Sequence, residues 1–173
     1  MEATIDIEFL PGNNEQVIKE AAIMSDDVHI HFLYRPPYHM EPHGSKENGL
    51  NWDDGFILYS QVHTVLTEAL APISHIYATG EDKYLLLGDI LNRPINDLEA
   101  LQCPDPSELK SDIYCQLTCH SFSNKRCALR NAHAQHSWLR YHIRFKTFIK
   151  CPRNNTRHTA AFSSGVPKPN TVM

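Results

Sequence analysis

Three short segments near the N-terminus, separated by two turns, restrict the fold more than any other feature of this 173-residue chain. Residues 4–10 and 28–34 alternate apolar and polar side chains, which is the pattern of half-buried strands. Residues 16–24 suit a strand, although their Ala and Glu residues also suit a helix. The turns at 11–14 and 25–27 are rich in Pro, Gly, Asn and Asp. Together these features predict an antiparallel meander of three strands.

The rest of the chain alternates between helical and extended patterns. The predicted elements are, in order, a loop over 35–55, a helix over 56–70, a strand over 75–79, a helix over 81–91, a strand within 94–101 and a helix from about 126 to 149. Strands that alternate with helices extend a sheet in parallel and place helices on its faces. We therefore expect one α/β domain with a mixed sheet over residues 1–150. A disordered basic tail is expected over 151–173.

The charges are distributed very unevenly along the chain. Residues 1–120 carry 6 Lys and Arg against 20 Asp and Glu, a net charge of −14. Residues 121–173 carry 10 Lys and Arg and no acidic residue, a net charge of +10. An acid-free basic segment of this length predicts binding to a polyanion, nucleic acid above all. Neutralisation of one part of the chain by the other is the alternative.

The last predicted helix combines basic residues with aromatic ones, among them Trp138, Tyr141 and Phe145. Phosphate contacts and base stacking from such a surface suit single-stranded nucleic acid. Aromatic residues at this spacing are also typical of a helix that packs on a core. The candidate nucleic-acid-binding residues are Arg126, Arg130, Arg140, Arg144 and Lys146.

Three cysteines and three histidines fall within residues 115–138, and the five cysteines of the chain form an odd number. The N-terminus lacks the basic start and apolar run of a signal peptide. No apolar run approaches the roughly 18 residues that a membrane span requires. We therefore expect an intracellular protein, cytoplasmic or nuclear, without a membrane segment. Its cysteines are then expected to be thiols or metal ligands.

Asp6 and Glu8 are the first pair of residues whose side chains suit a catalytic or metal-binding site. The two-residue period of a strand places both carboxylates on one face of the sheet. Two adjacent carboxylates repel each other, so they predict either a divalent-cation site or an exposed acidic face.

The element order resembles the ribonuclease H-like fold, and three motifs resemble those of DEDD-type exonucleases. These motifs are Asp6-x-Glu8, an acidic residue near Gly80 in the sequence Glu81-Asp82, and the run from Cys127 to His133 on the last helix. The resemblance implies a Mg²⁺- or Mn²⁺-dependent nuclease in which Asp6, Glu8 and Asp82 are catalytic. Cys127 and Asn131 stand where this family has a His and an Asp. These departures imply a degenerate centre, because a neutral amide weakens Mg²⁺ binding.

The chain is similar to Maelstrom-type domains, which have an exonuclease-like fold without its acidic set and hold zinc through a Glu, two Cys and a His. The resemblance implies a structural Zn²⁺ ligated by Glu8, by either Cys115 or Cys119, by His120 and by Cys127. Buried free thiols are the alternative.

The function that this resemblance implies is nucleic-acid binding, of RNA before DNA, in small-RNA or transposon silencing. An active metal-dependent nuclease that uses Asp6 and Glu8 is a second hypothesis. A protein-interaction module is a third, with an acidic body and a basic tail that bind partners of opposite charge.

Overall fold

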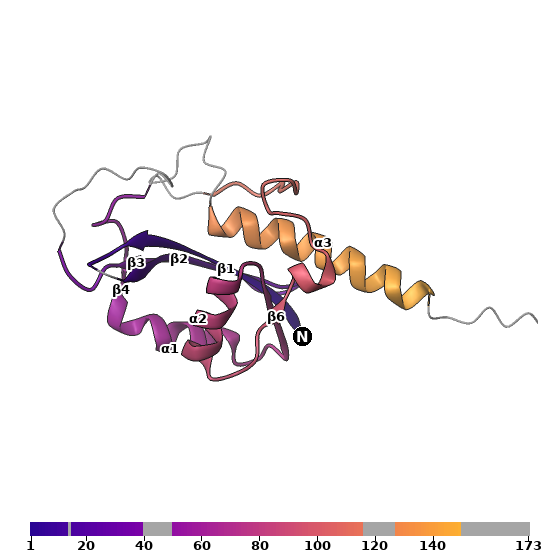
Figure 1. Cartoon of the computed structure of the whole chain (residues 1–173), viewed down its shortest axis with the longest axis horizontal. Coiled ribbons are helices and arrows are strands. Elements are labelled where there is room, and N and C mark those ends of the chain that lie inside the picture. The colour runs from indigo at the N-terminus through magenta and orange to yellow at the C-terminus, as the bar shows by residue number, and fades with distance from the viewer. Residues whose placement is uncertain (14, 40–49, 116–126, 150–173) are drawn as a thin grey trace, which may run out of the picture.

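A computed structural model describes residues 1–13, 15–39, 50–115 and 127–149. For residues 146–149 it describes the backbone but not the side chains. Within these ranges the chain forms a mixed sheet of six strands with helices on both faces (Figure 1). The strands are β1 (Glu2–Pro11), β2 (Gln16–Met24), β3 (His29–Arg35), β4 (Ile57–Leu58), β5 (His75–Ala78) and β6 (Asn96–Asp97). The helices are α1 (Val62–Leu70), α2 (Glu81–Leu91) and α3 (Ala128–Ile149), with 3-10 turns η1 (Tyr59–Gln61) and η2 (Glu99–Leu101).

The strand order is β4-β3-β2-β1-β5-β6. β1, β2 and β3 pair antiparallel, so the predicted meander is confirmed. β5 joins β1 in parallel, β6 joins β5 in parallel, and β4 lies parallel to β3 at the opposite edge. The predicted α/β class with a mixed sheet and flanking helices is confirmed by this topology.

The predicted helix over 56–70 is wrong in its first part, because β4 and η1 occupy residues 57–61. The backbone N–H of Phe56 donates to the Leu33 carbonyl at 3.0 Å, so this segment pairs with the edge of β3. Gly55 makes the approach possible with a φ of 135°, where a Cβ atom would lie 2.4 Å from the backbone nitrogen of Arg35. The helical pattern begins only at Val62.

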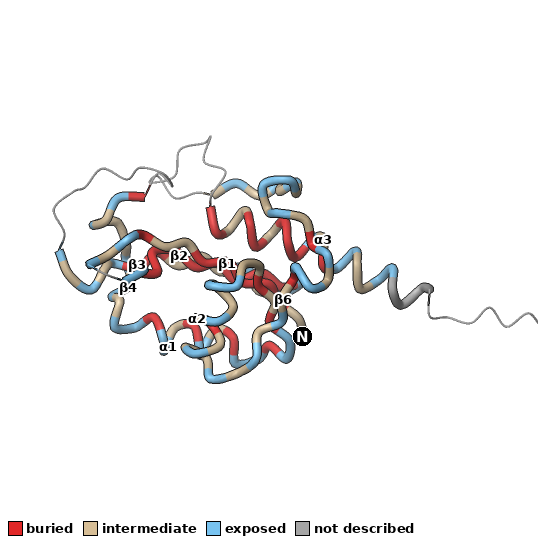
Figure 2. The backbone as a smooth tube through the Cα atoms, in the orientation of Figure 1, coloured by how far each residue is buried: buried red, intermediate tan, exposed pale blue. Residues whose placement is uncertain are grey.

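The two faces of the sheet differ in chemistry. One face packs against α1 and α2 through an apolar core that includes Ile5, Ile7, Leu66 and Leu87. The other face lies under α3, where Ala22 and Met24 of β2 pack against the alanines of its first turns, and the buried residues of the sheet lie between these layers (Figure 2). Only the face under α3 also carries buried acidic side chains, so it is the face that positions the site.

Lys19 fixes the loop after residue 50 to the sheet. The register between β1 and β2 shifts at Glu8 and Phe9, and Lys19 is the extra residue of this bulge. Its side chain is fully buried, and its ammonium donates to the carbonyls of Tyr34 at 2.9 Å, Trp52 at 2.6 Å and Asp54. A buried charge of this kind is tolerated because several oxygens solvate it.

No helix within the described ranges is sufficiently long and apolar to span a lipid bilayer.

Lys19→Met should lower the free energy of unfolding by about 2–3 kcal/mol, because it removes a buried charged donor shared by the carbonyls of Tyr34, Trp52 and Asp54. The exposed Lys110→Met is the matched control and should change stability by less than about 0.5 kcal/mol. Urea denaturation of both variants measures the difference, and equal midpoints would contradict this role for Lys19.

Candidate functional site

The polar residues under α3 form two neighbouring groups. Asp6 and Glu8 project from β1, and Glu20 projects from β2 beside them. Asp6 and Glu20 are 1% and 0% exposed, and the side chain of Glu8 is 13% exposed. Thr4, on the same strand face, donates its hydroxyl to the Ala132 carbonyl at 2.8 Å and so ties β1 to α3. Because burial removes the hydration of a carboxylate, each of these acids needs donors from the protein.

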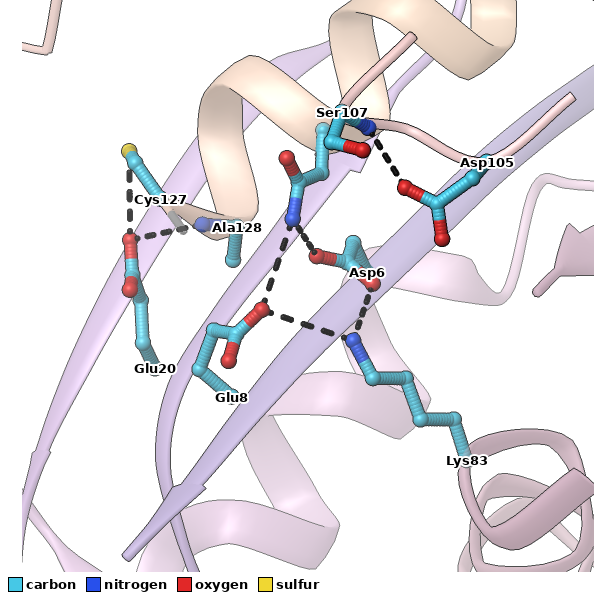
Figure 3. A network of polar contacts seen from close by, with 9 residues as sticks. Asp6, Glu8, Glu20, Lys83, Asp105, Ser107, Cys127 and Ala128 are labelled. Carbon is cyan, nitrogen blue, oxygen red and sulfur yellow. Dashed lines mark hydrogen bonds and ion pairs between the residues drawn. The ribbon is translucent and has the colours of Figure 1, made fainter. Parts of the chain in front are cut away.

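Lys83 and Asn131 supply the donors for Asp6 and Glu8. The Lys83 Nζ atom lies 2.7 Å from Asp6 Oδ1 and 3.5 Å from Glu8 Oε1 (Figure 3). The Asn131 amide Nδ2 donates to Asp6 Oδ2 at 2.9 Å and to Glu8 Oε1 at 3.4 Å. An ammonium from α2 and an amide from α3 therefore approach the same pair of carboxylates.

Burial and charge set the protonation of this group. Burial raises the pKa of Glu8 to about 7, with Asp6 and Glu20 adding to the shift and Lys83 opposing it. Burial also raises the pKa of Asp6 against the ion pair with Lys83. Burial would lower the pKa of Lys83, but the attraction of Asp6 and Glu8 raises it. Lys83 is therefore a protonated cation at neutral pH.

The Mg²⁺ or Mn²⁺ that the exonuclease resemblance implies does not fit this arrangement. A hard cation needs several oxygen ligands, preferably anionic ones. Asn131 turns its amide nitrogen toward the carboxylates, and the Lys83 ammonium lies against both of them. Asp82, the third acid of the predicted catalytic set, is exposed on α2 and does not line the cavity beside Asp6.

A cavity of about 590 Å³ opens beside these carboxylates. Its lining combines Asp6, Glu8, Glu99 and Asp105 with Lys83, the sole basic residue among the described lining residues. Its lining residues are Asp6, Glu8, Thr79, Gly80, Lys83, Glu99, Asp105, Pro106, Ser107, Asn131 and Gln135. Because acids outnumber bases here, the cavity repels phosphate groups and is unsuited to a nucleic-acid backbone.

Glu20 organises the second group. Its Oε1 atom accepts hydrogen bonds from the Ala128 backbone N–H at 3.1 Å and from the Cys127 thiol at 3.5 Å (Figure 3). The same oxygen contacts Nε2 of His31, from the neighbouring strand β3. A carboxylate at the start of α3 is favoured by the unpaired N–H groups and the dipole of the helix.

His31, Cys115 and Cys127 bring their ligand atoms within 4.8 Å of one another. The Nδ1 atom of His31 lies 3.7 Å from the Cys115 sulfur, whereas its Nε2 atom faces Glu20. One imidazole nitrogen and two thiol sulfurs are the donor set that zinc prefers. A histidine that binds metal with one nitrogen commonly holds a carboxylate with the other, as Glu20 would do here. This donor set is compatible with zinc and supplies three of the four ligands of a structural site.

The predicted zinc ligands are only partly brought together. Cys115 and Cys127 lie in the cluster, but Glu8 lies with Lys83 and Asn131, and Glu20 is the carboxylate beside the thiols. The remaining predicted ligands, Cys119 and His120, fall outside the described residues.

Sequence reasoning missed Glu20, His31 and Lys83. Glu20 had a signal, since it is the one acid of β2 and precedes the apolar run Ala21–Met24, and His31 had a weaker one in the alternation of β3. Nothing in the sequence distinguished Lys83 from the exposed charges beside it.

The candidate nucleic-acid-binding residues differ in exposure. Arg144 is exposed on α3, between Tyr141 and Phe145, which are 64% and 53% exposed and whose ring centroids are 5.3 Å apart. Arg140 is exposed and pairs with Asp26 at 3.0 Å. Arg130 is half-buried and lines a small pocket. Arg126 and the side chain of Lys146 fall outside the described residues.

Comparison with known proteins identifies no relative: no family model matches the chain, and neither a curated protein nor a solved structure matches it.

Glu8→Gln should make the chain more stable relative to wild type as pH rises from 4.5 to 7. Folding raises the pKa of Glu8 from its ordinary value of 4.5 to about 7, so the folded state binds more protons in this window. The contribution of Glu8 to stability therefore falls as pH rises, by up to about 3 kcal/mol. Urea denaturation at several pH values measures this, with the exposed Glu81→Gln as control. A constant difference from wild type across the window would contradict the shift.

Proposed function

We propose that this chain is a nucleic-acid-binding domain, for RNA in preference to DNA, with an inactive nuclease-like centre and a structural zinc ion. The observation that carries the proposal is the exposed pair Tyr141 and Phe145 with Arg144 between them on α3. Exposed aromatic faces stack bases and arginines bind phosphates, which together suit a single strand. These residues belong to the acid-free sequence segment 121–173, which carries a net charge of +10.

The position of this surface also supports the proposal. The C-terminal part of α3 extends beyond the edge of the sheet (Figure 1). The α3 residues that line the acidic cavity, Asn131 and Gln135, lie in the first half of the helix. A polyanion bound there avoids the carboxylates that line the cavity. Binding and the former catalytic position are thus separated on one helix, because Asn131 lies near its start and Phe145 lies beyond its middle.

A ribonuclease H-like fold is part of the proposal. The antiparallel meander followed by parallel β5 and β6, with helices on both faces, is compatible with it. The pair Asp6 and Glu8 on β1, opposite Asn131 on α3, is also compatible with a degenerate exonuclease centre. By the resemblance to Maelstrom-type domains, the proposal extends to small-RNA or transposon silencing.

The structural zinc would be held by His31, Cys115 and Cys127, with Glu20 orienting the histidine. Glu20 lies in β2 and His31 in β3, whereas Cys115 lies in the chain before α3 and Cys127 directly precedes the helix. A metal bound by them would fasten the start of α3 to the sheet, which is the role of a structural zinc site.

Tyr141→Ala with Phe145→Ala should weaken binding to a single-stranded RNA oligonucleotide by about five- to hundredfold, since stacking contributes about 1–3 kcal/mol per base. Arg144→Ala should reduce the dependence of log K on log salt by about one. Arg35→Ala, an exposed arginine on β3, is the control and should leave both quantities unchanged.

Fluorescence anisotropy across a KCl series makes this measurement. Unchanged RNA affinity in the double variant would contradict the proposed surface. A protein partner captured equally well after nuclease treatment, without RNA affinity, would favour the interaction module instead.

Cys127→Ser and Cys115→Ser should each remove zinc and lower stability by about 3 kcal/mol, or Tm by roughly 6–12 °C. Cys103→Ser is the matched control, because Cys103 is a buried free thiol that packs with Leu98 and Leu139 away from the cluster. Burial raises the pKa of the Cys127 thiol, and metal binding must displace its proton, so zinc affinity should fall as pH is lowered. Metal analysis with thermal denaturation tests this. Full zinc content in Cys127→Ser would exclude the site.

A further inference from the structure

The Lys83 ammonium brings a positive charge to the acidic face of β1. It lies within hydrogen-bond distance of Asp6 and within ion-pair distance of Glu8, two carboxylates on the same face of β1 (Figure 3). Two buried carboxylates at this spacing repel each other and need positive charge between them. In a carboxylate pair that binds metal, the divalent cation supplies that charge. Here a side chain of the same protein supplies it.

The backbone holds Lys83 in this position. β5 ends at Ala78, and Gly80, with a φ of 93°, turns the chain into α2. The N–H of Lys83 donates to the Gly80 carbonyl at 3.0 Å, so Lys83 lies in the first turn of the helix. Its side chain is 23% exposed and its ammonium reaches inward to Asp6, which is 1% exposed. The contact is therefore built by the β5–α2 connection and does not depend on a flexible surface side chain.

We propose that Lys83 is the tethered cation of this centre, and that its ammonium takes the place of a divalent metal ion between Asp6 and Glu8. The centre is then a latent divalent-cation site, closed to Mg²⁺ and Mn²⁺ as long as Lys83 is present. The inference rests on the inactive nuclease-like centre proposed above and deepens it, and it is argued from the contacts of Lys83 and Asn131 with Asp6 and Glu8. It stands whether or not the chain binds RNA or zinc.

Two physical arguments indicate that a divalent ion and the Lys83 ammonium do not bind between Asp6 and Glu8 at the same time. An ion bound by both carboxylates would lie roughly 3–4 Å from the ammonium, where like charges repel strongly in a partly buried site. Asn131 also turns an N–H donor toward both carboxylates, since its Nδ2 donates to Asp6 at 2.9 Å and to Glu8 at 3.4 Å, and a donor there is less favourable to a cation than the carboxylate it replaces. Removing the lysine side chain would remove the repulsion and leave the carboxylates with space and excess negative charge, the conditions that favour a hard cation.

The test compares Mn²⁺ binding by wild type and by Lys83→Ala. The purified protein is titrated with MnCl₂, and electron paramagnetic resonance measures the free ion. Lys83→Ala should bind Mn²⁺ about tenfold or more tightly than wild type, because a unit of positive charge has left the site. Lys83→Arg retains the cation and should bind Mn²⁺ as weakly as wild type. Adding Asp6→Asn to Lys83→Ala should abolish the gain, which places the bound ion at Asp6 and not in the cysteine cluster.

Two results would overturn the proposal. One is tight Mn²⁺ binding by wild type that Asp6→Asn abolishes, because the ion would then displace the ammonium without difficulty. The other is a folded Lys83→Ala that gains no affinity. If Lys83→Ala is unfolded in the absence of metal, MnCl₂ should restore its circular dichroism spectrum, and no recovery at millimolar MnCl₂ would also count against the proposal. Failure of RNA binding in the α3 variants would leave all these outcomes unchanged.

Discussion

The burial of three carboxylates beneath α3 is the constraint on which the rest of this structure depends. Asp6, Glu8 and Glu20 lie on the sheet face that the helix covers, where water cannot solvate them fully. Each is stable there only because donors from other elements reach it. Lys83 brings α2 to β1, while the backbone N–H of Ala128 brings the start of α3 to β2. These directional polar contacts therefore add to the apolar packing that α3 makes through Ala128 and Ala132 and, farther along the helix, through Leu139.

One helix links both polar groups to the proposed binding surface. Cys127 and Ala128 contact Glu20 where α3 begins, and Asn131 contacts Asp6 and Glu8 one turn later. The exposed Tyr141 and Phe145 lie on the same helix beyond the sheet. A metal ion at the start of α3 would thus hold the helix that carries the stacking residues. In the proposed account, zinc supports the orientation of the nucleic-acid surface and takes no part in contact with the ligand.

Local patterns in the sequence were sufficient for much of the fold and insufficient for the sites. β2 and α2 have the predicted bounds, because period-two and helical periodicity dominate there. The segment at 57–61 was missed because its pairing with β3 is a tertiary contact that overrides a helical pattern. The resemblance to Maelstrom-type domains implied Glu8 as the zinc carboxylate, and nothing in the spacing of Asp6 and Glu8 indicated that Glu20 is the acid beside Cys127. Asp82 and Lys83 differ by one helical step, and only the packing of α2 decides which one turns toward Asp6.

We propose that the buried acids bind two kinds of positive charge, a metal ion beside Glu20 and the Lys83 ammonium between Asp6 and Glu8. Anomalous diffraction from a crystal grown with both zinc and manganese tests it most directly. The account predicts a zinc peak among His31 Nδ1 and the sulfurs of Cys115 and Cys127, and no manganese peak at Asp6, where density for the Lys83 ammonium remains. A manganese peak between Asp6 and Glu8 with the Lys83 side chain displaced, or a cysteine cluster without zinc, would contradict it.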